Sequence, residues 1–271
     1  MTLAEKSDVL NTKELKQCCA RLYESDVARL LLGDSFHPGG LKLTERLGQL
    51  LRLAPESRVL DVASGRGTSA MFLAERFGCE VIGIDYSRQN AEQANHDSVA
   101  KGFGMRVRFQ QADAESLPFP EGSFTAVVCE CAFCTFPEKA QVAREFARVL
   151  SPGGRVGMSD LTRGPALPKE LDSLLAWVAC IADSQPLENY IRCLLSAGLS
   201  HETTELHDEA LLEMVRQVQT KLLGVEVMSG LKKIDLPGMD LTAAKQMAKS
   251  ALAAVQQRQL GYAIVVAKKP I

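Results

Sequence analysis

The sequence predicts an α/β fold with a doubly wound parallel sheet. Over residues 56–161, short apolar segments alternate with helical patterns, which is typical of strand–helix–strand units. The first apolar segment runs into a turn with two glycines, Gly65 and Gly67, and a helical pattern follows at once. Glycines permit a sharp turn and a close approach to a ligand because they carry no Cβ. With 271 residues, of which 46% are hydrophobic, the chain can bury a sizeable core.

The chain divides into three predicted parts, residues 1–53, 54–161 and 162–271. The first part has helical periodicity, broken by a turn-rich stretch at 33–40. The second part contains five predicted strands, at 58–62, 80–85, 106–111, 124–129 and 154–160. In the third part we expect helices at 167–181, 186–197, 209–224 and 241–258, and strands at 200–207 and 262–267. The last strand is apolar and β-branched, which favours a buried position.

Three acidic residues follow the first three apolar runs and indicate the ligand. A dinucleotide site needs three glycines and no carboxylate facing its phosphates, whereas here the third glycine is missing and Asp61 would repel a dianion. An acid suits a cationic ligand, and S-adenosylmethionine carries an ammonium and a sulfonium. Asp85 is placed to accept hydrogen bonds from both ribose hydroxyls, and Asp113 to accept one from an adenine amino group. The three placements together predict a site for this methyl donor.

These residues resemble the class I S-adenosylmethionine-dependent methyltransferases over about residues 40–160. The segment 146–155 matches the helix, turn and strand start that precede the fifth strand of that family. The resemblance implies a doubly wound, seven-stranded, Rossmann-like sheet whose last strand inserts antiparallel beside the sixth. It also implies an N-terminal helical lid at 1–53, a donor-binding core at 54–161 and acceptor-side helices within 162–271. Roughly fifty mostly helical residues would interrupt the last hairpin, an unusually long connection.

The same resemblance assigns the cofactor-binding residues. It implies that one group lines the methionine and ribose part of the donor, namely Asp61, Ala63, Gly65 and Gly67. Asp85 and Tyr86 would hold the ribose, and Asp113 with the backbone N–H of Ala114 would hold the adenine. Glu130, at the end of the fourth strand, would lie near the cofactor.

Composition excludes several classes of partner. The net charge of −2 and the pI near 6.1 give no electrostatic footprint for nucleic acid. The polar stretch from Met1 to Asn11 lacks the apolar core of a signal peptide, and no apolar run reaches the roughly 18 residues needed to cross a bilayer. We therefore expect a cytoplasmic protein whose cysteines remain thiols.

The cysteines suggest the methyl acceptor. The eight cysteines are Cys18, Cys19, Cys79, Cys129, Cys131, Cys134, Cys180 and Cys193. Three of them cluster at the carboxyl end of the fourth strand, where ligands of open α/β sheets bind. Cys131 comes just past that strand, and Cys180 lies in the segment after the fifth strand, which in this fold covers the same pocket. Soft thiolates select soft centres, and trivalent arsenic is among the softest.

A closer resemblance connects these cysteines with the arsenite methyltransferases. Cys131 precedes Pro137-Glu138-Lys139 at the spacing of that family, and Cys180 precedes a small-residue stretch and a helix that ends in Ala197-Gly198. The resemblance covers most of residues 20–200. It implies that Cys131 and Cys180 bind As(III) as the substrate. The turn where many members of that family carry a further cysteine is Gly33-Asp34-Ser35 here and has no thiol, so Cys18 and Cys19 are the candidates for a third catalytic thiol. The resemblance also implies a detoxification role and a reducing thiol or thioredoxin-type reductant as partner.

Several alternatives stay open at this point. We expect Cys79, Cys129 and Cys193 to pack in the core, and Cys134 has either role. Cys18 and Cys19 are adjacent and point to different faces of a helix, so at most one easily faces the pocket.

Other residues and functions also remain candidates. His37 is either a general base or part of the loop structure, and no spacing of histidines and cysteines resembles a zinc site, so no metal is expected. Tyr23 and Trp177 either shield the sulfonium or pack in the core. Two alternative functions are methylation of another small molecule on oxygen, nitrogen, carbon or a thiol, and metalloid binding without catalysis.

Overall fold

The computed structural model describes most of the chain from residue 35 onward. The described residues are 16, 17, 20, 24, 30, 31, 33, 35–164, 167, 168, 171, 181, 183–230 and 240–271, without the side chains of 227–230. Cys18, Cys19 and Cys180, together with Tyr23 and Trp177, lie outside these residues. Most of the predicted lid at 1–53 and of the predicted helix at 167–181 lie outside them as well, so both remain predictions.

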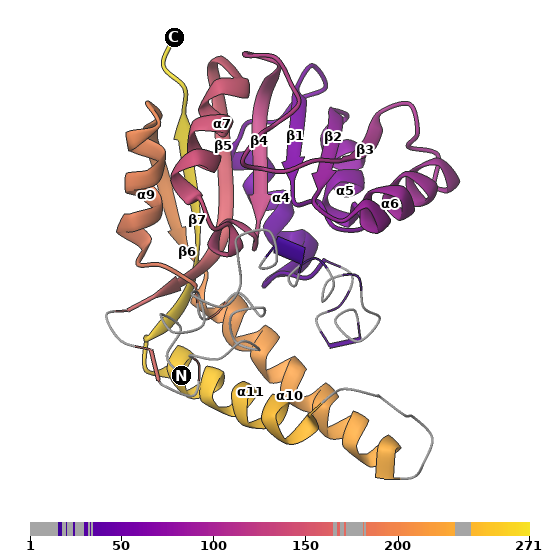
Figure 1. Ribbon diagram of the computed structural model, residues 1–271, viewed down its shortest axis with the longest axis vertical. Coiled ribbons are helices and arrows are strands. Elements are labelled where there is room, and N and C mark those ends of the chain that lie inside the picture. The colour runs from indigo at the N-terminus through magenta and orange to yellow at the C-terminus, as the bar shows by residue number, and fades with distance from the viewer. Residues whose placement is uncertain are drawn as a thin grey trace.

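A seven-stranded sheet forms the centre of the molecule, as the sequence predicts (Figure 1). Its strands are β1 (Arg58–Val62), β2 (Glu80–Asp85), β3 (Val107–Gln111), β4 (Phe124–Glu130), β5 (Leu150–Arg163), β6 (Ser200–Leu206) and β7 (Leu260–Lys268). Their order is β3-β2-β1-β4-β5-β7-β6. The first five strands are parallel, and β7 is antiparallel to both of its neighbours. The inserted antiparallel last strand is confirmed.

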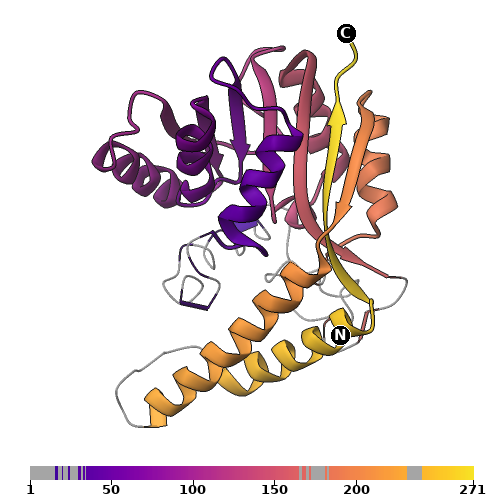
Figure 2. The same cartoon turned by 180° about the vertical axis from the view of Figure 1, so that it is seen from behind.

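Helices cover both faces of the sheet (Figures 1 and 2). They are α4 (Gly40–Leu50), α5 (Thr68–Phe77), α6 (Arg88–Ala100), α7 (Lys139–Val149), α9 (Leu187–Ser196), α10 (Asp208–Gly230) and α11 (Leu241–Gln256), with a short 3₁₀ turn η1 (Phe133–Thr135). α4 lies on one face of the sheet, and α7 and α9 lie on the other. Strands β1 and β4 are buried on both faces, which explains why their sequences are almost continuously apolar.

The fifth strand is longer than the sequence predicts. The apolar pattern indicates 154–160, but β5 runs from Leu150, which pairs with Phe124 of β4, to Arg163, which pairs with Leu260 of β7. The last strand is also longer, beginning at Leu260 rather than residue 262. Cross-strand pairing therefore extends both strands beyond their continuous apolar stretches.

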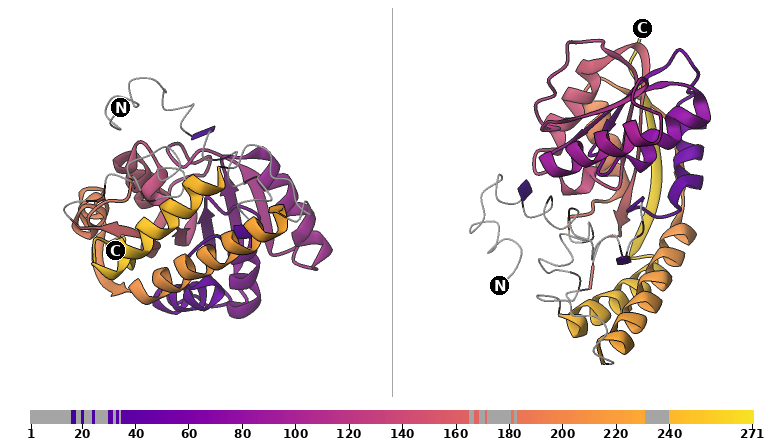
Figure 3. Two further views of the ribbon diagram at one scale, coloured as in Figure 1. Left: turned by 90° about the horizontal axis from the view of Figure 1, so that it is seen from below. Right: turned by 90° about the vertical axis from the view of Figure 1, so that its right-hand side faces the viewer.

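The insertion between β6 and β7 is a helical hairpin of α10 and α11. It lies beyond the carboxyl ends of the parallel strands, and the two helices run side by side (Figures 1 and 3). A small apolar cluster of Leu222, Ala244 and Ala248 holds them together. Leu31 packs against this cluster, and its carbonyl oxygen accepts a hydrogen bond from Lys221 Nζ at 3.0 Å. None of the helices in the described part of the chain is long and apolar enough to cross a membrane.

Candidate active site

An open cavity lies at the carboxyl ends of the parallel strands. It has about 1140 Å³ of empty space, its open mouth included. Eight of the nine predicted cofactor residues line it: Asp61, Ala63, Gly65, Asp85, Tyr86, Asp113, Ala114 and Glu130. Residues from the turns after four strands therefore meet in one place, because parallel strands end at the same edge of a sheet.

Asp61 is a buried acidic group of the cavity. It belongs to β1, its exposure is 3%, and its buried Oδ2 has no hydrogen-bond partner within the described part of the chain. Burial, followed by the negative charges of Glu130 and Asp85, raises the pKa of Asp61 well above its usual value. A carboxylate without a partner is costly to bury, and a cationic group of a ligand would offset that cost. The orphaned oxygen therefore fits the ammonium of S-adenosylmethionine.

The turn after β1 is held in a backbone conformation that favours glycine. Ala63, Gly65 and Gly67 have φ angles of 58°, 53° and 78°. The backbone N–H of Gly65 donates to Asp85 Oδ2 at 2.8 Å, which joins the turn to the end of β2. Gly67 does not line the cavity. A Cβ at Gly67 would lie 2.2 Å from Cζ of Phe109, so this glycine lets β3 pack beneath the turn.

Asp85 is already bonded on both of its carboxylate oxygens. Besides Gly65, its Oδ1 accepts hydrogen bonds from the backbone N–H of Ser87 at 2.8 Å and from Asn90 Nδ2 at 3.4 Å. Burial raises the pKa of Asp85, and these hydrogen bonds oppose the rise. A carboxylate has about four lone-pair sites, so acceptor capacity for a ligand hydroxyl remains.

At the other end of the cavity, Asp113 is paired with a residue of the N-terminal segment. Lys16 Nζ lies 2.7 Å from Asp113 Oδ2 and 2.5 Å from Glu115 Oε2, and 5.8 Å from the centre of the Tyr86 ring. Burial lowers the pKa of Lys16, but its two acidic partners together raise it above the usual value. The sequence gives no signal for this pair, because Lys16 and Asp113 are separated by 97 residues.

Among the described cysteines, Cys131 is the one that lines the cavity. It directly follows β4 with φ of 52°, and its backbone N–H donates to Ser159 O at 2.7 Å. Such a left-handed conformation is strained for a cysteine and is typical of functional sites. Its partner in the arsenic hypothesis, Cys180, lies outside the described residues, so their proximity stays a prediction.

The remaining described cysteines are packed away from the cavity. Cys79, Cys129 and Cys134 are fully buried, and Cys193 is half-buried on α9. Burial raises the pKa of Cys79 to about 11, which keeps it a thiol. The expected core packing of Cys79 and Cys129 agrees with these positions. In the described part of the chain, no group of three or more His, Cys, Asp or Glu is placed to hold a metal ion.

His37 forms a buried polar cluster with three residues of the surrounding elements. Its Nε2 lies 3.5 Å from Glu130 Oε2, 3.3 Å from Thr44 Oγ1 and 3.4 Å from Ser69 Oγ. His37, Ser69 and Glu130 all line the cavity. The sequence indicates His37 as a candidate but gives no signal for Thr44 or Ser69, whose roles depend on how α4 and α5 pack.

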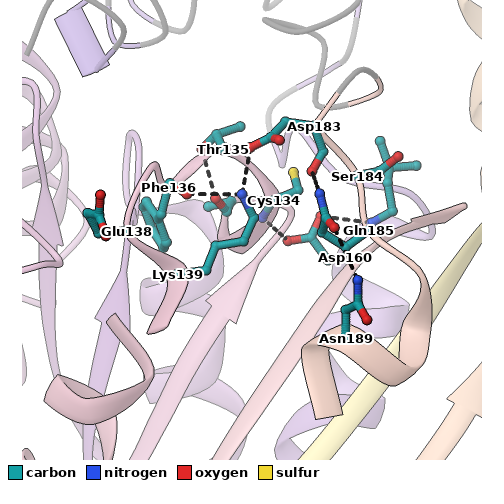
Figure 4. A network of polar contacts seen from close by, with 12 residues as sticks. Cys134, Thr135, Phe136, Glu138, Lys139, Asp160, Asp183, Ser184, Gln185 and Asn189 are labelled. Carbon is teal, nitrogen blue, oxygen red and sulfur yellow. Dashed lines mark hydrogen bonds and ion pairs between the residues drawn. The ribbon is translucent and has the colours of Figure 1, made fainter. Parts of the chain in front are cut away.

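A polar network fixes the loop that carries Cys131 (Figure 4). Lys139 Nζ donates to Asp183 Oδ2 at 2.5 Å and to the carbonyl oxygen of Phe136 at 3.0 Å. Nearby, Asp160 accepts a hydrogen bond from the backbone N–H of Cys134 at 2.9 Å. Lys139 of the Pro-Glu-Lys turn thus joins the loop after β4 to the segment that precedes α9.

Comparisons with known proteins agree with this arrangement. A family model described as a methyltransferase domain matches residues 59–154. Methyltransferase GfsG of Streptomyces halstedii is 30% identical over 240 residues, which cover 88% of this chain and 83% of that protein. The 27-O-demethylrifamycin SV methyltransferase of Amycolatopsis mediterranei is 30% identical over 232 residues, 84% of this chain and 83% of that protein.

Solved structures share the fold across nearly the whole chain. The crystal structure of a putative sarcosine dimethylglycine methyltransferase from Galdieria sulphuraria superposes with a TM-score of 0.78, at 18% identity. The match covers 93% of this chain and 98% of that one. The family-model match, the two relatives and the cavity with its orphaned carboxylate lead to one conclusion: the chain belongs to the class I S-adenosylmethionine-dependent methyltransferases.

Proposed function

We propose that this methyltransferase acts on a small organic acceptor that binds beside Glu130 and Cys131. The observation that carries the proposal is the continuous cavity that extends from the orphaned Oδ2 of Asp61 to Cys131 and His37. When bound, S-adenosylmethionine supplies an electrophilic methyl group. Everything else that the reaction needs, namely binding, orientation and exclusion of water, falls to the side chains and backbone of the cavity.

On this proposal the donor lies along the ends of the strands in a fixed direction. Asp61 binds its ammonium, and the turn at Ala63 and Gly65 lies against its methionine part. Asp85 and Tyr86 hold the ribose, and Asp113 with the Ala114 backbone holds the adenine. Two observations support this direction. The strand order β3-β2-β1-β4 arranges the strand ends with Asp113, Asp85, Asp61 and Glu130 along one edge of the sheet, and Asp61 Oδ2 has no partner among the described residues. Glu130 would then lie on the side where the methyl group is transferred.

The lining of the acceptor side supports an organic molecule. It combines the aromatic rings of Phe36 and Phe136 with the polar groups of His37, Thr135 and Glu130. Such a mixture of apolar walls and a few polar groups is typical of sites for small organic ligands. A relative with 30% identity is named for methylation of a rifamycin oxygen, which supports the same class of acceptor.

The second candidate acceptor is trivalent arsenic, and the position of Cys131 favours it. The Cys131 thiol lines the cavity and precedes the Pro-Glu-Lys turn, as in the arsenite methyltransferases that the sequence resembles. On this hypothesis Cys131 and Cys180 bind As(III) as substrate, with Cys18 or Cys19 as the third thiolate. A reducing thiol or a thioredoxin-type protein would then be the partner that keeps these thiols reduced.

One experiment separates the two acceptors. Protein, S-adenosylmethionine and a reducing thiol are incubated either with arsenite or with a panel of small alcohols, phenols and amines, and the products are identified by mass spectrometry. We expect a methylated organic product, and we expect Cys131→Ser to retain at least about a third of the wild-type rate because a thiol of the cavity wall is replaced by a group of similar size. Cys193→Ser is the control, since Cys193 does not line the cavity.

Two other outcomes of this experiment would contradict the organic acceptor. Methylated arsenic that disappears in Cys131→Ser but persists in Cys193→Ser would overturn the organic acceptor and establish the arsenic hypothesis. Arsenite that binds tightly with no methylation of any acceptor would instead indicate a metalloid-binding protein that retains the fold.

A further inference from the structure

His37 is held in one tautomer by its surroundings. Its exposure is 5%, and its Nδ1 lies 3.1 Å from the carbonyl oxygen of Pro38. A carbonyl oxygen only accepts hydrogen bonds, so Nδ1 carries a hydrogen and donates it. In the neutral imidazole, Nε2 is then the nitrogen that carries the basic lone pair.

The groups around Nε2 suit an atom that gains a proton. Thr44 Oγ1 donates to the Glu130 carboxylate at 3.0 and 3.2 Å, so its hydrogen is engaged there. Glu130 Oε2 itself lies 3.5 Å from Nε2, close enough to stabilise a positive charge on the ring. Glu130 and His37 both line the cavity, so an acceptor bound there can reach this pair.

We infer that Nε2 of His37 accepts the proton of a hydroxyl acceptor, and that the enzyme is therefore an O-methyltransferase. This inference rests on the proposed organic acceptor and narrows it to alcohols and phenols. In the reaction the acceptor oxygen forms a bond to the methyl carbon, the electron pair of the S–C bond stays on sulfur, and the O–H proton moves to Nε2. The charge lost by the sulfonium is thus regained as an imidazolium beside Glu130, and the cavity keeps its total charge.

This charge balance distinguishes a hydroxyl acceptor from thiolate-bound arsenic. An arsenic atom bound by thiolates attacks with a lone pair and releases no proton at that step, so it needs no base. A hydroxyl is a weak nucleophile until a base takes its proton, and a positioned base typically accelerates such a step by about 10²–10⁴-fold. A buried histidine with an orienting carbonyl on one nitrogen and a carboxylate near the other has a use with a hydroxyl acceptor and none with a thiolate-bound arsenic acceptor.

The first test is spectroscopic and needs no acceptor. The ring nitrogens of the four histidines are observed by ¹⁵N–¹H NMR in the complex with S-adenosylhomocysteine at pH 8, and His37 is assigned from the spectrum of His37→Asn. We expect a hydrogen on Nδ1 and none on Nε2. A hydrogen on Nε2 in this complex would overturn the inference, because that atom would have no lone pair to offer.

The second test measures catalysis with a hydroxyl acceptor found in the panel. His37→Asn keeps a side-chain donor for Pro38 O but has no base, and we expect its kcat to fall by about 10²–10⁴-fold with KM changed less than about threefold. Exogenous imidazole should restore part of the activity of His37→Ala. His96→Asn, on the exposed surface of α6, is the matched control with unchanged kinetics.

Folding and donor binding are checked for each variant by thermal unfolding and by calorimetry with S-adenosylhomocysteine. If His37→Asn does not fold, His37→Gln replaces it in the same comparison. A kcat within about threefold of wild type would overturn the role of His37 while leaving the organic acceptor in place. Methylation of amines or arsenite but of no alcohol or phenol would also overturn it, and only the arsenite result would contradict the proposed function itself.

Discussion

Asp61→Asn is expected to weaken the binding of S-adenosylmethionine by about 10–100-fold. The substitution keeps the shape of the side chain but removes the charge of a buried oxygen that has no partner among the described residues. A hydrogen bond to a charged group contributes about 1.5–3 kcal/mol, and each 1.4 kcal/mol corresponds to a tenfold change in Kd. Isothermal titration calorimetry measures the change directly. Asp97→Asn on α6, away from the cavity, is the control, and a Kd for Asp61→Asn within about threefold of wild type would contradict the assignment.

The raised pKa of Asp61 also predicts that donor binding depends on pH, and that Asp61→Asn changes this dependence. Burial makes the protonated form persist above the usual pKa of an aspartate, whereas the ammonium of the donor favours the ionised form. Donor binding should therefore release protons and become tighter as the pH rises through the raised pKa, and Asp61→Asn should lose most of this dependence. Calorimetry in buffers with different ionisation enthalpies measures the released protons.

Rising pH, which strengthens donor binding, has the opposite effect on the stability of the ligand-free protein. Because the pKa of Asp61 is higher in the folded state than in the unfolded state, its stabilising contribution is complete below the unfolded pKa of about 3.9 and is lost as the pH rises through the folded pKa. At neutral pH the ligand-free wild type thus carries an unfavourable carboxyl that asparagine replaces by a neutral group. We expect the Tm of ligand-free Asp61→Asn to equal or exceed that of wild type, so the loss of affinity is not a loss of fold.

Gly67→Ala is expected to lower the free energy of unfolding by about 2–5 kcal/mol. The φ of 78° costs a residue with a Cβ roughly 1–2 kcal/mol, and overpacking costs typically 1–3 kcal/mol more. The overpacking arises because the added Cβ would lie 2.2 Å from Cζ of Phe109. Urea unfolding followed by circular dichroism measures the loss. The glycine would then matter for the packing of β3 against the turn rather than for direct contact with the cofactor.

Gly102 serves as the control that separates the cost of backbone strain from the cost of overlap with Phe109. Gly102 has a similar φ of 81°, but nothing lies within 4 Å of a Cβ placed there, so Gly102→Ala reports the backbone strain alone. The difference between the two variants measures the overlap with Phe109. In the double variant Gly67→Ala/Phe109→Leu the overlap term should shrink, as for residues in contact. Equal losses in Gly67→Ala and Gly102→Ala would contradict the role of Phe109.

Sequence patterns predict the strands and the acids at their ends because both are local. An apolar run defines a strand, and a residue that follows it must lie at the edge of the sheet, which is how Asp61, Asp85 and Asp113 could be placed around one cavity. By contrast, Asp61 Oδ2 has no partner on any element that the structure describes, and no local sequence pattern reveals this.

The contacts that shape the site join segments far apart in the chain. Lys16 reaches Asp113, and Lys139 reaches Asp183 across 44 residues. The cluster of His37 and Glu130 depends on α4 lying against the end of β4. Sequence periodicity indicates which face of an element is buried but not which other element covers that face. These long-range contacts could therefore be identified only from the structure.

A structure of the complex with S-adenosylhomocysteine tests whether the donor binds at Asp61 in the proposed direction. We expect the ammonium of the bound molecule to lie within hydrogen-bonding distance of Asp61 Oδ2, the ribose to contact Asp85, and the adenine to lie beside Asp113. The sulfur should face the side of the cavity formed by Glu130 and Cys131. A molecule bound in the reverse direction, or one that leaves Asp61 Oδ2 without a partner, would contradict this mode of binding.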